Sequence, residues 1–505
     1  MSARIRSYAL LAFVLILLGK LSGFLKDIIF TYYYGVSNVT DGYFLANSIS
    51  SLLYIAVYAS IPVIVVPLYS RLLTNNNQAQ TDRDLTRVMI FFLGTSLVLS
   101  GLVTFWSEEI VQVFAAGASE EVRGLANDYL KIMALTFALS TVVGFLNALQ
   151  SVHKRPLPSY IVPLVNNAIF CFGLMILSAS HGLREILYLG VVAWLLLVLV
   201  NAWSCRYYFS PSVGGGDSSP GFVSMLGVFA PAAFSFYVEQ GNNYVGVYFA
   251  SRLGDGAISI LGYAGKLNLI FLSVFLVFLT ATLFPKIARL VADNDQQGLE
   301  DYVNLCLRTI FLSAIPIVVF MIFYARSLVE LLFQRGKFSE ADAISVAAVL
   351  AVILTAVPFA LGRDLLNRVF FSRGNTSRPL LISVTALMLN LVFSIFSYQL
   401  YGMLGLAWSI VLSTIASFLF ATYFVRKDLD IKLVSPNFWT IFVSVCCVVP
   451  AVALLVLMDA YVTDFWLLLC LPFASCYFAG LCLCNVREPR LFMQWAQRRI
   501  SFFSK

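Results

Sequence analysis

Long apolar stretches alternate with short polar segments along the whole chain. A helix of about 20 apolar residues crosses the hydrocarbon core of a bilayer, whereas a barrel strand shows only about ten residues of alternating polarity. Fourteen stretches have the length and continuity of spanning helices, so the pattern predicts an all-α polytopic membrane protein with 14 transmembrane helices. Their predicted cores are residues 7–34, 42–68, 88–107, 125–151, 158–179, 186–205, 222–251, 257–284, 303–324, 341–371, 379–400, 403–425, 436–458 and 463–484.

The composition supports the same class of protein. Of the 505 residues, 60% are hydrophobic and 12% are charged, and the mean hydropathy is +0.87. A soluble fold of this length could not bury so much apolar surface. The loops are short and contain no zinc-protease, phosphate-loop or Ser–His–Asp pattern, so the sequence predicts a transporter and not an enzyme.

Cysteine and histidine show no spacing typical of a metal site. Cys171, Cys446, Cys447, Cys470 and Cys476 lie within predicted spans, where packing is the simplest interpretation. The two histidines, His153 and His181, stand alone in separate short loops. The sequence therefore predicts no metal and no cofactor.

Positive charge concentrates on one side of the predicted membrane. With the N-terminus in the cytoplasm, the cytoplasmic loops and the C-terminal tail hold most arginines and lysines, while loop 108–121 on the other side is acidic. The positive-inside rule then places both termini in the cytoplasm, which an even number of spans also requires. The net charge of +7 follows from this topology and gives no reason to expect a nucleic-acid partner. Arg4 and Arg6 precede an apolar run without a small-residue cleavage site, so we interpret that run as the first span and not as a signal peptide.

Two halves of the chain repeat weakly at a spacing near 220 residues. The Gly-Tyr pair at Gly42 recurs at Gly262, and the loops near Gly117 and Gly336 fall in register. Repeats of like orientation predict two lobes related by an axis along the membrane normal, with alternating access to a cavity between them. The predicted division is an N-terminal six-helix lobe (1–208), a linker (209–221), a C-terminal six-helix lobe (222–427), an extra helix pair (428–485) and a basic cytoplasmic tail (486–505).

Ionisable residues within the predicted spans are the candidate functional groups, because such groups are costly at membrane depth unless they meet water or a partner. A cavity rich in positive charge suits an anionic substrate such as a diphosphate. The predicted substrate-binding residues are Lys20, Lys26, Asp27, Asp41 and Lys266. The candidate coupling or lobe-interface residues are Glu239, Asn243, Arg363, Asp364 and Asn390. A second interpretation stays open, in which the pairs Lys26–Asp27 and Arg363–Asp364 only neutralise each other and hold helices together.

Several of these residues belong to a recognisable signature. The run from Lys20 through Lys26 and Asp27, followed by Thr40-Asp41-Gly-Tyr-Phe, resembles the first-span signature of the MurJ/MviN lipid II flippase family. That family belongs to the multidrug/oligosaccharidyl-lipid/polysaccharide exporter superfamily. Further similar segments are 263–267, 284–285, 332–338 and 370–379, so the resemblance covers most of the chain.

The resemblance implies a flippase in the bacterial cytoplasmic (inner) membrane that moves undecaprenyl-diphosphate-linked saccharides by alternating access. It implies coupling to the membrane potential or to Na⁺ or H⁺, and a final helix pair that accommodates the lipid. The family's basic cavity residues fall on Lys20, Lys26 and Lys266, and its acidic one on Asp41. The implied partners are the lipid-linked anionic saccharide, membrane lipids and cell-envelope biosynthesis proteins.

The chain also departs from the family pattern. Members that flip lipid II usually carry arginine where this chain has its three cavity lysines, and an arginine pair of the second span falls on Tyr54 and Ile55. Lysine is a compact point charge without the bidentate geometry of arginine. Exopolysaccharide, O-antigen or capsule repeat units therefore stay open as alternative cargoes. A cation-coupled drug antiporter and a non-transporting cell-wall scaffold are the alternatives from other classes.

Overall fold

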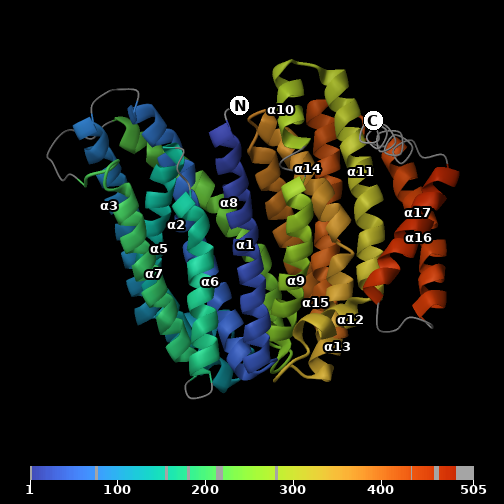
Figure 1. Cartoon of the computed structure of the whole chain (residues 1–505), viewed down its shortest axis with the longest axis horizontal. Coiled ribbons are helices and arrows are strands. Elements are labelled where there is room, and N and C mark those ends of the chain that lie inside the picture. Colours follow the sequence, from blue (N-terminus) through green and yellow to red (C-terminus); the bar gives the residue numbers. More distant parts are fainter. Residues whose placement is uncertain are drawn as a thin grey trace. The chain divides into compact units, whose positions relative to one another are not determined.

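A computed structural model of the chain is helical throughout the residues it describes, which are 3–73, 78–153, 157–178, 182–211, 220–278, 283–433, 435–459 and 466–484 (Figure 1). The helices are α1 (Ala3–Tyr34), α2 (Asn38–Leu72), α3 (Gln78–Phe105), α4 (Ser107–Phe114), α5 (Glu120–Val152), α6 (Leu157–Leu177), α7 (Leu183–Cys205), α8 (Pro220–Ala250), α9 (Ala257–Phe278), α10 (Phe284–Ala292), α11 (Gln296–Phe323), α12 (Ala325–Phe333), α13 (Glu340–Leu354), α14 (Val357–Ser372), α15 (Ser377–Leu429), α16 (Ser435–Asp459) and α17 (Cys470–Leu483), with a 3₁₀ turn at Trp466–Leu469. His181, most of the predicted linker and the predicted tail lie outside the described residues.

The prediction of a helical, multi-span membrane protein is confirmed. In the part of the chain that the structure describes, nine helices are long and apolar enough to cross a bilayer, or ten if α13 and α14 form one broken span. Helices suit this setting because they satisfy every backbone hydrogen bond internally, which a lipid environment requires. The full count of 14 spans stays a prediction.

The longest helix, α15, is a hairpin of two helices. Gly402 interrupts it with φ of 56° and ψ of −130°, which only glycine adopts readily. Arg378 and Asp428 form an ion pair of 2.5 Å, although a straight helix would separate them by about 75 Å. The hydroxyls of Ser397 and Ser409 also meet, at 2.6 Å, beside the bend. The break coincides with the boundary that the hydropathy pattern predicts between residues 400 and 403.

Proline and short amphipathic helices account for the main local differences from the predicted spans. The predicted span 341–371 is broken into α13 and α14, which bend by 42°. Pro358, which has no N–H to donate, lies in the first turn of α14. The short helices α4, α10 and α12 were not predicted, because their charged residues hide them from a hydropathy pattern.

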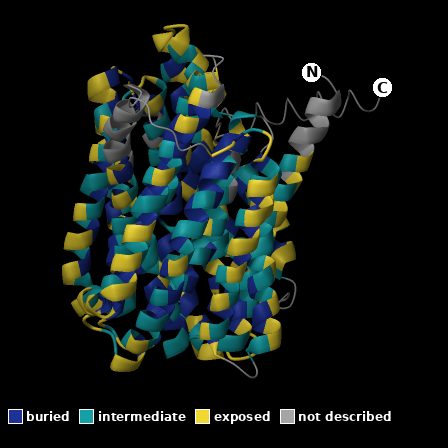
Figure 2. Cartoon of the chain, turned by 90° about the vertical axis from the view of Figure 1, so that its left-hand side faces the viewer, coloured by how far each residue is buried: buried dark blue, intermediate teal, exposed yellow. Residues whose placement is uncertain are grey.

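The chain forms two compact units, which differ in their limits from the predicted lobes. One consists of Met1–Gly262 with Leu332–Ala343, and is called unit 1 here; the other, unit 2, consists of Tyr263–Leu331 with Ile344–Lys505. The chain passes from one unit to the other inside α9, α12 and α13. Figure 2 shows that buried positions lie along the helix sides that face other helices, with exposed positions on the outer sides and at helix ends.

Unit 1 contains a buried polar contact between α2 and α5 at Tyr54. The Tyr54 hydroxyl lies 2.7 Å from the carbonyl of Phe137 and 2.7 Å from the hydroxyl of Thr141, and its ring stacks on Phe137 at 4.3 Å. Ser140 also donates to the tyrosine oxygen, at 2.8 Å. Tyr54, at a position where the resemblance implies an arginine, thus joins two helices.

Unit 2 contains the C-terminal helix pair, α16 and α17, which packs against α11. The Tyr477 hydroxyl of α17 donates to the carbonyl of Leu312 at 3.0 Å and lies 2.6 Å from the hydroxyl of Ser444. Tyr324 stacks on Trp466 at 5.1 Å and donates to Asp459 at 3.0 Å. These contacts fasten both ends of the pair to α11.

Candidate functional site

Helix α1 carries the first candidate groups, Lys20 and Lys26, at positions that differ in exposure. Lys20 is exposed, whereas Lys26 is half-buried with its Nζ 5.6 Å from the ring centre of Phe170 on α6. Phe170 and Tyr43 together give this lysine an aromatic surrounding, their rings lying 6.3 Å apart. Such rings attract a cation through their faces. Asp27, one residue further, is also half-buried.

Close packing of α1 on α6 (Figure 1) sets the position of these lysines. A Cβ on Gly19 would lie 3.7 Å from Pro163, and one on Gly23 would lie 3.4 Å from the amide of Asn167. That amide donates to the Ser22 hydroxyl at 3.1 Å. The small residues of α1 therefore face α6, which leaves Lys20 on an open side of the helix.

Asp41, at the start of α2, is almost completely buried, with 1% of its surface exposed. One carboxylate oxygen accepts the Gly256 N–H at 2.6 Å, and the other accepts the Ser259 N–H at 2.7 Å and the Ser259 hydroxyl. These donors lie at the N-terminus of α9, on Gly256 directly before the helix and on Ser259 in its first turn, where N–H groups lack partners within the helix. Asp41 therefore links α2 to the beginning of α9, and we call these contacts the Asp41 clamp.

The start of α2 is itself well defined, which positions Asp41. Ser37 and Thr40 form a capping box, in which the Ser37 N–H donates to the Thr40 hydroxyl at 2.9 Å and the Thr40 N–H donates to the Ser37 hydroxyl at 3.4 Å. The Ser259 hydroxyl extends this network to Thr40, at 2.7 Å. Asp41 was predicted as a substrate-binding residue; nothing in its sequence neighbourhood signalled a partner more than 200 residues away.

Two loops that the repeat placed in register occupy matching positions in unit 1. The loop at Gly117 lies against the end of α8, where a Cβ on Gly117 would come within 2.3 Å of Arg252. The loop at Gly336 lies against the end of α1, where the Lys337 N–H donates to the carbonyl of Tyr32 at 2.9 Å. Since α1 and α8 begin the two halves of the repeat, each half covers the end of the other's first helix.

Helix α8 carries a row of exposed polar side chains at intervals of four residues. Ser235, Glu239 and Asn243 are all exposed, and four residues advance a helix by 400°, so the three lie on one side. We call these residues the α8 polar stripe. On α2, Asn47 is the exposed residue in the otherwise buried or half-buried run 38–61.

The candidate residues of unit 2 are dispersed over three helices. Lys266 on α9 is half-buried. On α14, Asp364 forms an ion pair of 2.8 Å with Arg368, one turn further along the helix, while Arg363 donates to the Ser417 hydroxyl at 3.4 Å. The acid of the proposed Arg363–Asp364 pair thus has Arg368 as its ion-pair partner.

Asn390 and a surface cavity complete the candidate positions of unit 2. Asn390 on α15 is buried, with the hydroxyl of Ser394 at 3.5 Å. A cavity of about 480 Å³ lies where the α10–α11 connection meets the end of α14, and its lining includes Asp295, Gln296 and Arg373. None of the predicted site residues lines this cavity.

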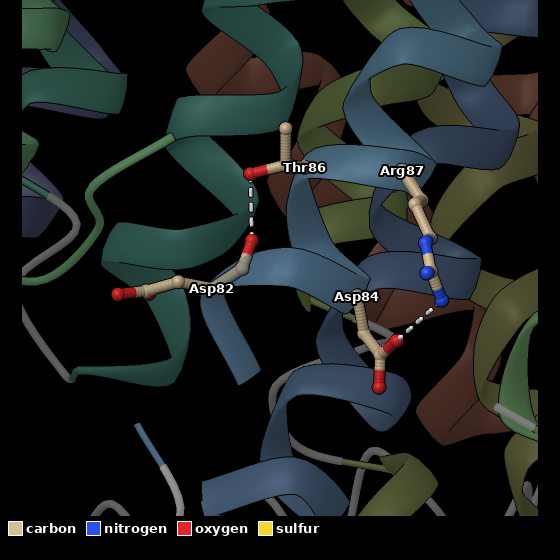
Figure 3. A network of polar contacts seen from close by, with 4 residues as sticks. All are labelled: Asp82, Asp84, Thr86 and Arg87. Carbon is tan, nitrogen blue, oxygen red and sulfur yellow. Dashed lines mark hydrogen bonds and ion pairs between the residues drawn. The ribbon is translucent and has the colours of Figure 1, made fainter. Parts of the chain in front are cut away.

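Hydropathy gave no signal for a polar network at the ends of α2, α3, α5 and α7 in unit 1. On α3, Arg87 pairs with the buried Asp84 at 3.5 Å, and the Thr86 hydroxyl donates to the backbone carbonyl of Asp82 at 2.6 Å (Figure 3). His153, predicted to stand alone, lies with its Nε2 2.6 Å from the hydroxyl of the fully buried Tyr69. The histidine is therefore part of a packed helix end.

A multi-span helical fold that carries lysines on α1 and α9 and the α8 polar stripe is typical of a membrane transporter. The family model described as "Lipid II flippase MurJ" matches residues 30–476. The chain belongs to this lipid II flippase MurJ family, a family of transporters and not of enzymes that serves peptidoglycan biosynthesis. The resemblance on which the sequence analysis relied is thereby confirmed.

Relatives and solved structures agree with this assignment. The "Probable lipid II flippase MurJ" of Aquifex aeolicus is 24% identical over 392 residues, which cover 76% of each chain. The "Lipid II flippase MurJ" of Burkholderia cenocepacia is 25% identical over 417 residues and 78% of each chain. A structure described as "Lipid II flippase MurJ, inward closed conformation" aligns with a TM-score of 0.78 at 21% identity, covering 94% of this chain and 98% of that one. An inward-facing multidrug resistance MATE family transporter aligns with a TM-score of 0.64 at 14% identity, covering 80% and 98%.

Proposed function

We propose that the chain moves an undecaprenyl-diphosphate-linked saccharide, lipid II or a related polysaccharide precursor, across the bacterial cytoplasmic membrane by alternating access. The observation that carries this proposal is the pair of lysines on α1 within a chain of the lipid II flippase family. Both lie within the predicted span 7–34, and a cation at membrane depth needs water or an anion. A diphosphate supplies two negative charges close together.

The surroundings of Lys26 favour a bound diphosphate. Its ammonium lies 5.6 Å from the centre of the Phe170 ring, which packs near the Tyr43 ring, and these rings limit the water around it. A charge interaction is stronger in such surroundings than in water. Lys20 lies six residues earlier, about 9 Å along the helix, and is exposed. The exposed lysine would meet the headgroup first, and the half-buried one would hold it.

The proposed architecture is 14 transmembrane helices, as two six-helix lobes with an extra C-terminal pair and both termini in the cytoplasm. The α15 hairpin and the docking of α16 and α17 on α11 support the last four of these spans. The charge distribution of the loops supports the orientation. The reciprocal cover of α1 and α8 ends by the Gly336 and Gly117 loops supports the internal repeat.

We further propose that the Asp41 clamp must open during the transport cycle. It joins α2, in the first half of the repeat, to α9, in the second half, and alternating access moves such halves apart at one end. Coupling to the membrane potential, Na⁺ or H⁺ belongs to the same proposal, with Glu239 as the candidate coupling residue because it is an exposed acid within the predicted span 222–251.

A second candidate cargo is an exopolysaccharide, O-antigen or capsule repeat unit linked to the same lipid. The observation that favours it is lysine at 20, 26 and 266, together with Tyr54 in a buried contact where the family pattern has arginine. Both cargoes share the undecaprenyl diphosphate, so the lysines serve either one.

The test is complementation of bacterial cells depleted of their own lipid II flippase. We expect the wild-type chain to restore growth and the Lys20→Ala/Lys26→Ala variant to fail at equal membrane abundance. Lys427→Ala, which removes an exposed lysine near Tyr423, is the matched control and should rescue fully. Rescue by the double variant would refute the lysine site, whereas failure of the wild type would remove lipid II and leave the second cargo to be tested in a strain lacking its O-antigen flippase.

A further inference from the structure

The α8 polar stripe is the feature that the diphosphate site leaves unexplained. Glu239 is a charged side chain within the predicted span 222–251, and its exposure shows that no other described part of unit 1 covers it. A carboxylate facing lipid tails would be strongly destabilising, so this side of α8 must face water or a polar ligand. Ser235 and Asn243 continue the same side over two turns, which is more than one coupling ion requires.

The depth of the stripe can be worked out from contacts within unit 1. The Tyr237 hydroxyl of α8 donates to the carbonyl of Leu53 on α2 at 3.3 Å. Six residues after α8 ends, Gly256 meets Asp41 near the start of α2. The two helices therefore run antiparallel, and moving six residues from the Tyr237 level, about 9 Å, brings Asn243 level with Asn47.

The α1 lysines lie within the same layer. Helices α1 and α2 are joined by a short turn and run antiparallel, with Phe30 and Tyr43 in ring contact at 4.9 Å. Lys26 is four residues before Phe30 and Asn47 is four residues after Tyr43, so these two residues share one depth. By the same count Lys20 is level with Leu53 and Tyr237. The cationic side chains of α1 and the polar stripe of α8 thus occupy the same depth range.

The chemistry of the stripe differs from that of the lysines. Asn, Ser and Glu side chains offer neutral donors and acceptors together with one carboxylate. An anion is repelled by that carboxylate, whereas sugar hydroxyl and amide groups hydrogen-bond to all three residue types. In a lipid-linked saccharide, the first sugar is bonded directly to the diphosphate, so a sugar-binding surface must lie near the depth of the cations.

We propose that Ser235, Glu239 and Asn243, with Asn47 at the same depth, bind the saccharide of the cargo and determine which saccharide is carried. This inference rests on the proposed function, because it takes the diphosphate to be held by Lys20 and Lys26. The lysines bind the part that all such cargoes share. The α8 polar stripe contacts the part in which they differ.

The test compares binding of three probes to the purified full-length protein in nanodiscs: undecaprenyl diphosphate, lipid II, and undecaprenyl diphosphate carrying a single hexose. We expect wild type to bind at least one saccharide-bearing probe more tightly than undecaprenyl diphosphate. One hydrogen bond contributes about 2- to 10-fold in affinity. Ser235→Ala/Asn243→Ala should therefore weaken the preferred saccharide probe by about 4- to 100-fold and leave undecaprenyl diphosphate within about 2-fold.

Two controls separate the possible results. Lys20→Ala should weaken all three probes by a similar factor, and Gln399→Ala, which removes an exposed amide on α15, should change none of them. Retained binding of undecaprenyl diphosphate also shows that the double variant is folded. The inference would be overturned if the double variant lost equal affinity for all three probes, if it lost none, or if the wild type bound the three probes equally. A wild type that binds none of the probes would instead overturn the proposed function.

Discussion

Replacing Asp41 by asparagine should free the beginning of α9. The carboxylate accepts three hydrogen bonds, from two backbone N–H groups and one hydroxyl of the 256–259 turn. Asparagine keeps one acceptor oxygen and turns an N–H₂ group toward a donor. Losing one charge-assisted hydrogen bond costs about 1.5–3 kcal/mol, and losing a negative charge at a helix N-terminus costs about 1 kcal/mol more. We therefore expect the local opening free energy to fall by about 3 kcal/mol.

Hydrogen exchange followed by mass spectrometry measures this quantity directly. A decrease of about 3 kcal/mol accelerates exchange of the Gly256 and Ser259 amides by about 100-fold, since 1.4 kcal/mol corresponds to a factor of ten. Asp255→Asn is the matched control, because Asp255 is exposed and its substitution removes the same charge beside the same turn. Unchanged protection in Asp41→Asn, or equal acceleration in Asp255→Asn, would refute the hydrogen-bonding argument.

A second substitution tests whether the contacts act as one unit. Ser259→Ala removes the hydroxyl and keeps the backbone N–H, so its expected effect is about 1 kcal/mol, or about 5-fold in exchange. Groups that share one partner are not additive. The double variant Asp41→Asn/Ser259→Ala should therefore exchange less than 500-fold faster than wild type, and full additivity would show that the contacts are independent.

Two further predictions concern stability in detergent. Gly336→Ala should lower Tm by several degrees relative to Gly94→Ala. Gly336 has φ of 59° and a Cβ there would lie 2.3 Å from the backbone carbonyl oxygen of Tyr32, whereas a Cβ on Gly94 would meet open space. Equal Tm values for the two variants would contradict the tight turn at Gly336. Gly402→Ala should destabilise the α15 hairpin by about 1–3 kcal/mol, which a lower Tm than that of Gly94→Ala would show. An unchanged Tm would show that the bend tolerates a side chain.

Hydropathy and the positions of glycines predicted much of the fold, because both signals depend on the local environment of the residue itself. Gly402 falls between two predicted spans, and the loops at Gly117 and Gly336 occupy the matching positions that the repeat suggested. Lipid requires long helices, and tight bends require glycine, so both leave a local signal. Charged short helices such as α4 and α12 leave none, because an amphipathic helix of eight or nine residues resembles a polar loop.

The candidate site was less predictable, because its chemistry depends on partners distant in sequence. Asp41 was predicted as a substrate-binding residue, which stays a prediction, and its oxygens accept hydrogen bonds from residues more than 200 positions away. One of the two open interpretations paired Asp364 with its neighbour Arg363. Adjacent residues of a helix point about 100° apart, and in the structure Asp364 forms an ion pair with Arg368. The sequence likewise does not show which residues of a predicted span are exposed. Exposure distinguishes Glu239 and Asn243 from the half-buried Gln240 and Asn242 beside them.

Lysine in place of arginine on α1 bears on where cargo selectivity resides. Arginine imposes bidentate geometry on a phosphate, while lysine attracts any nearby anion as a point charge. A lysine site therefore discriminates little between diphosphates, and selection must come from groups that contact the saccharide. Lys20→Arg should accordingly raise the affinity for undecaprenyl diphosphate and for its saccharide-bearing forms by the same factor, of about 3- to 10-fold. Measured with the same three probes, a change in the ratio between them would show that residue 20 itself selects the cargo, and the α8 polar stripe would then not be the sole determinant of specificity.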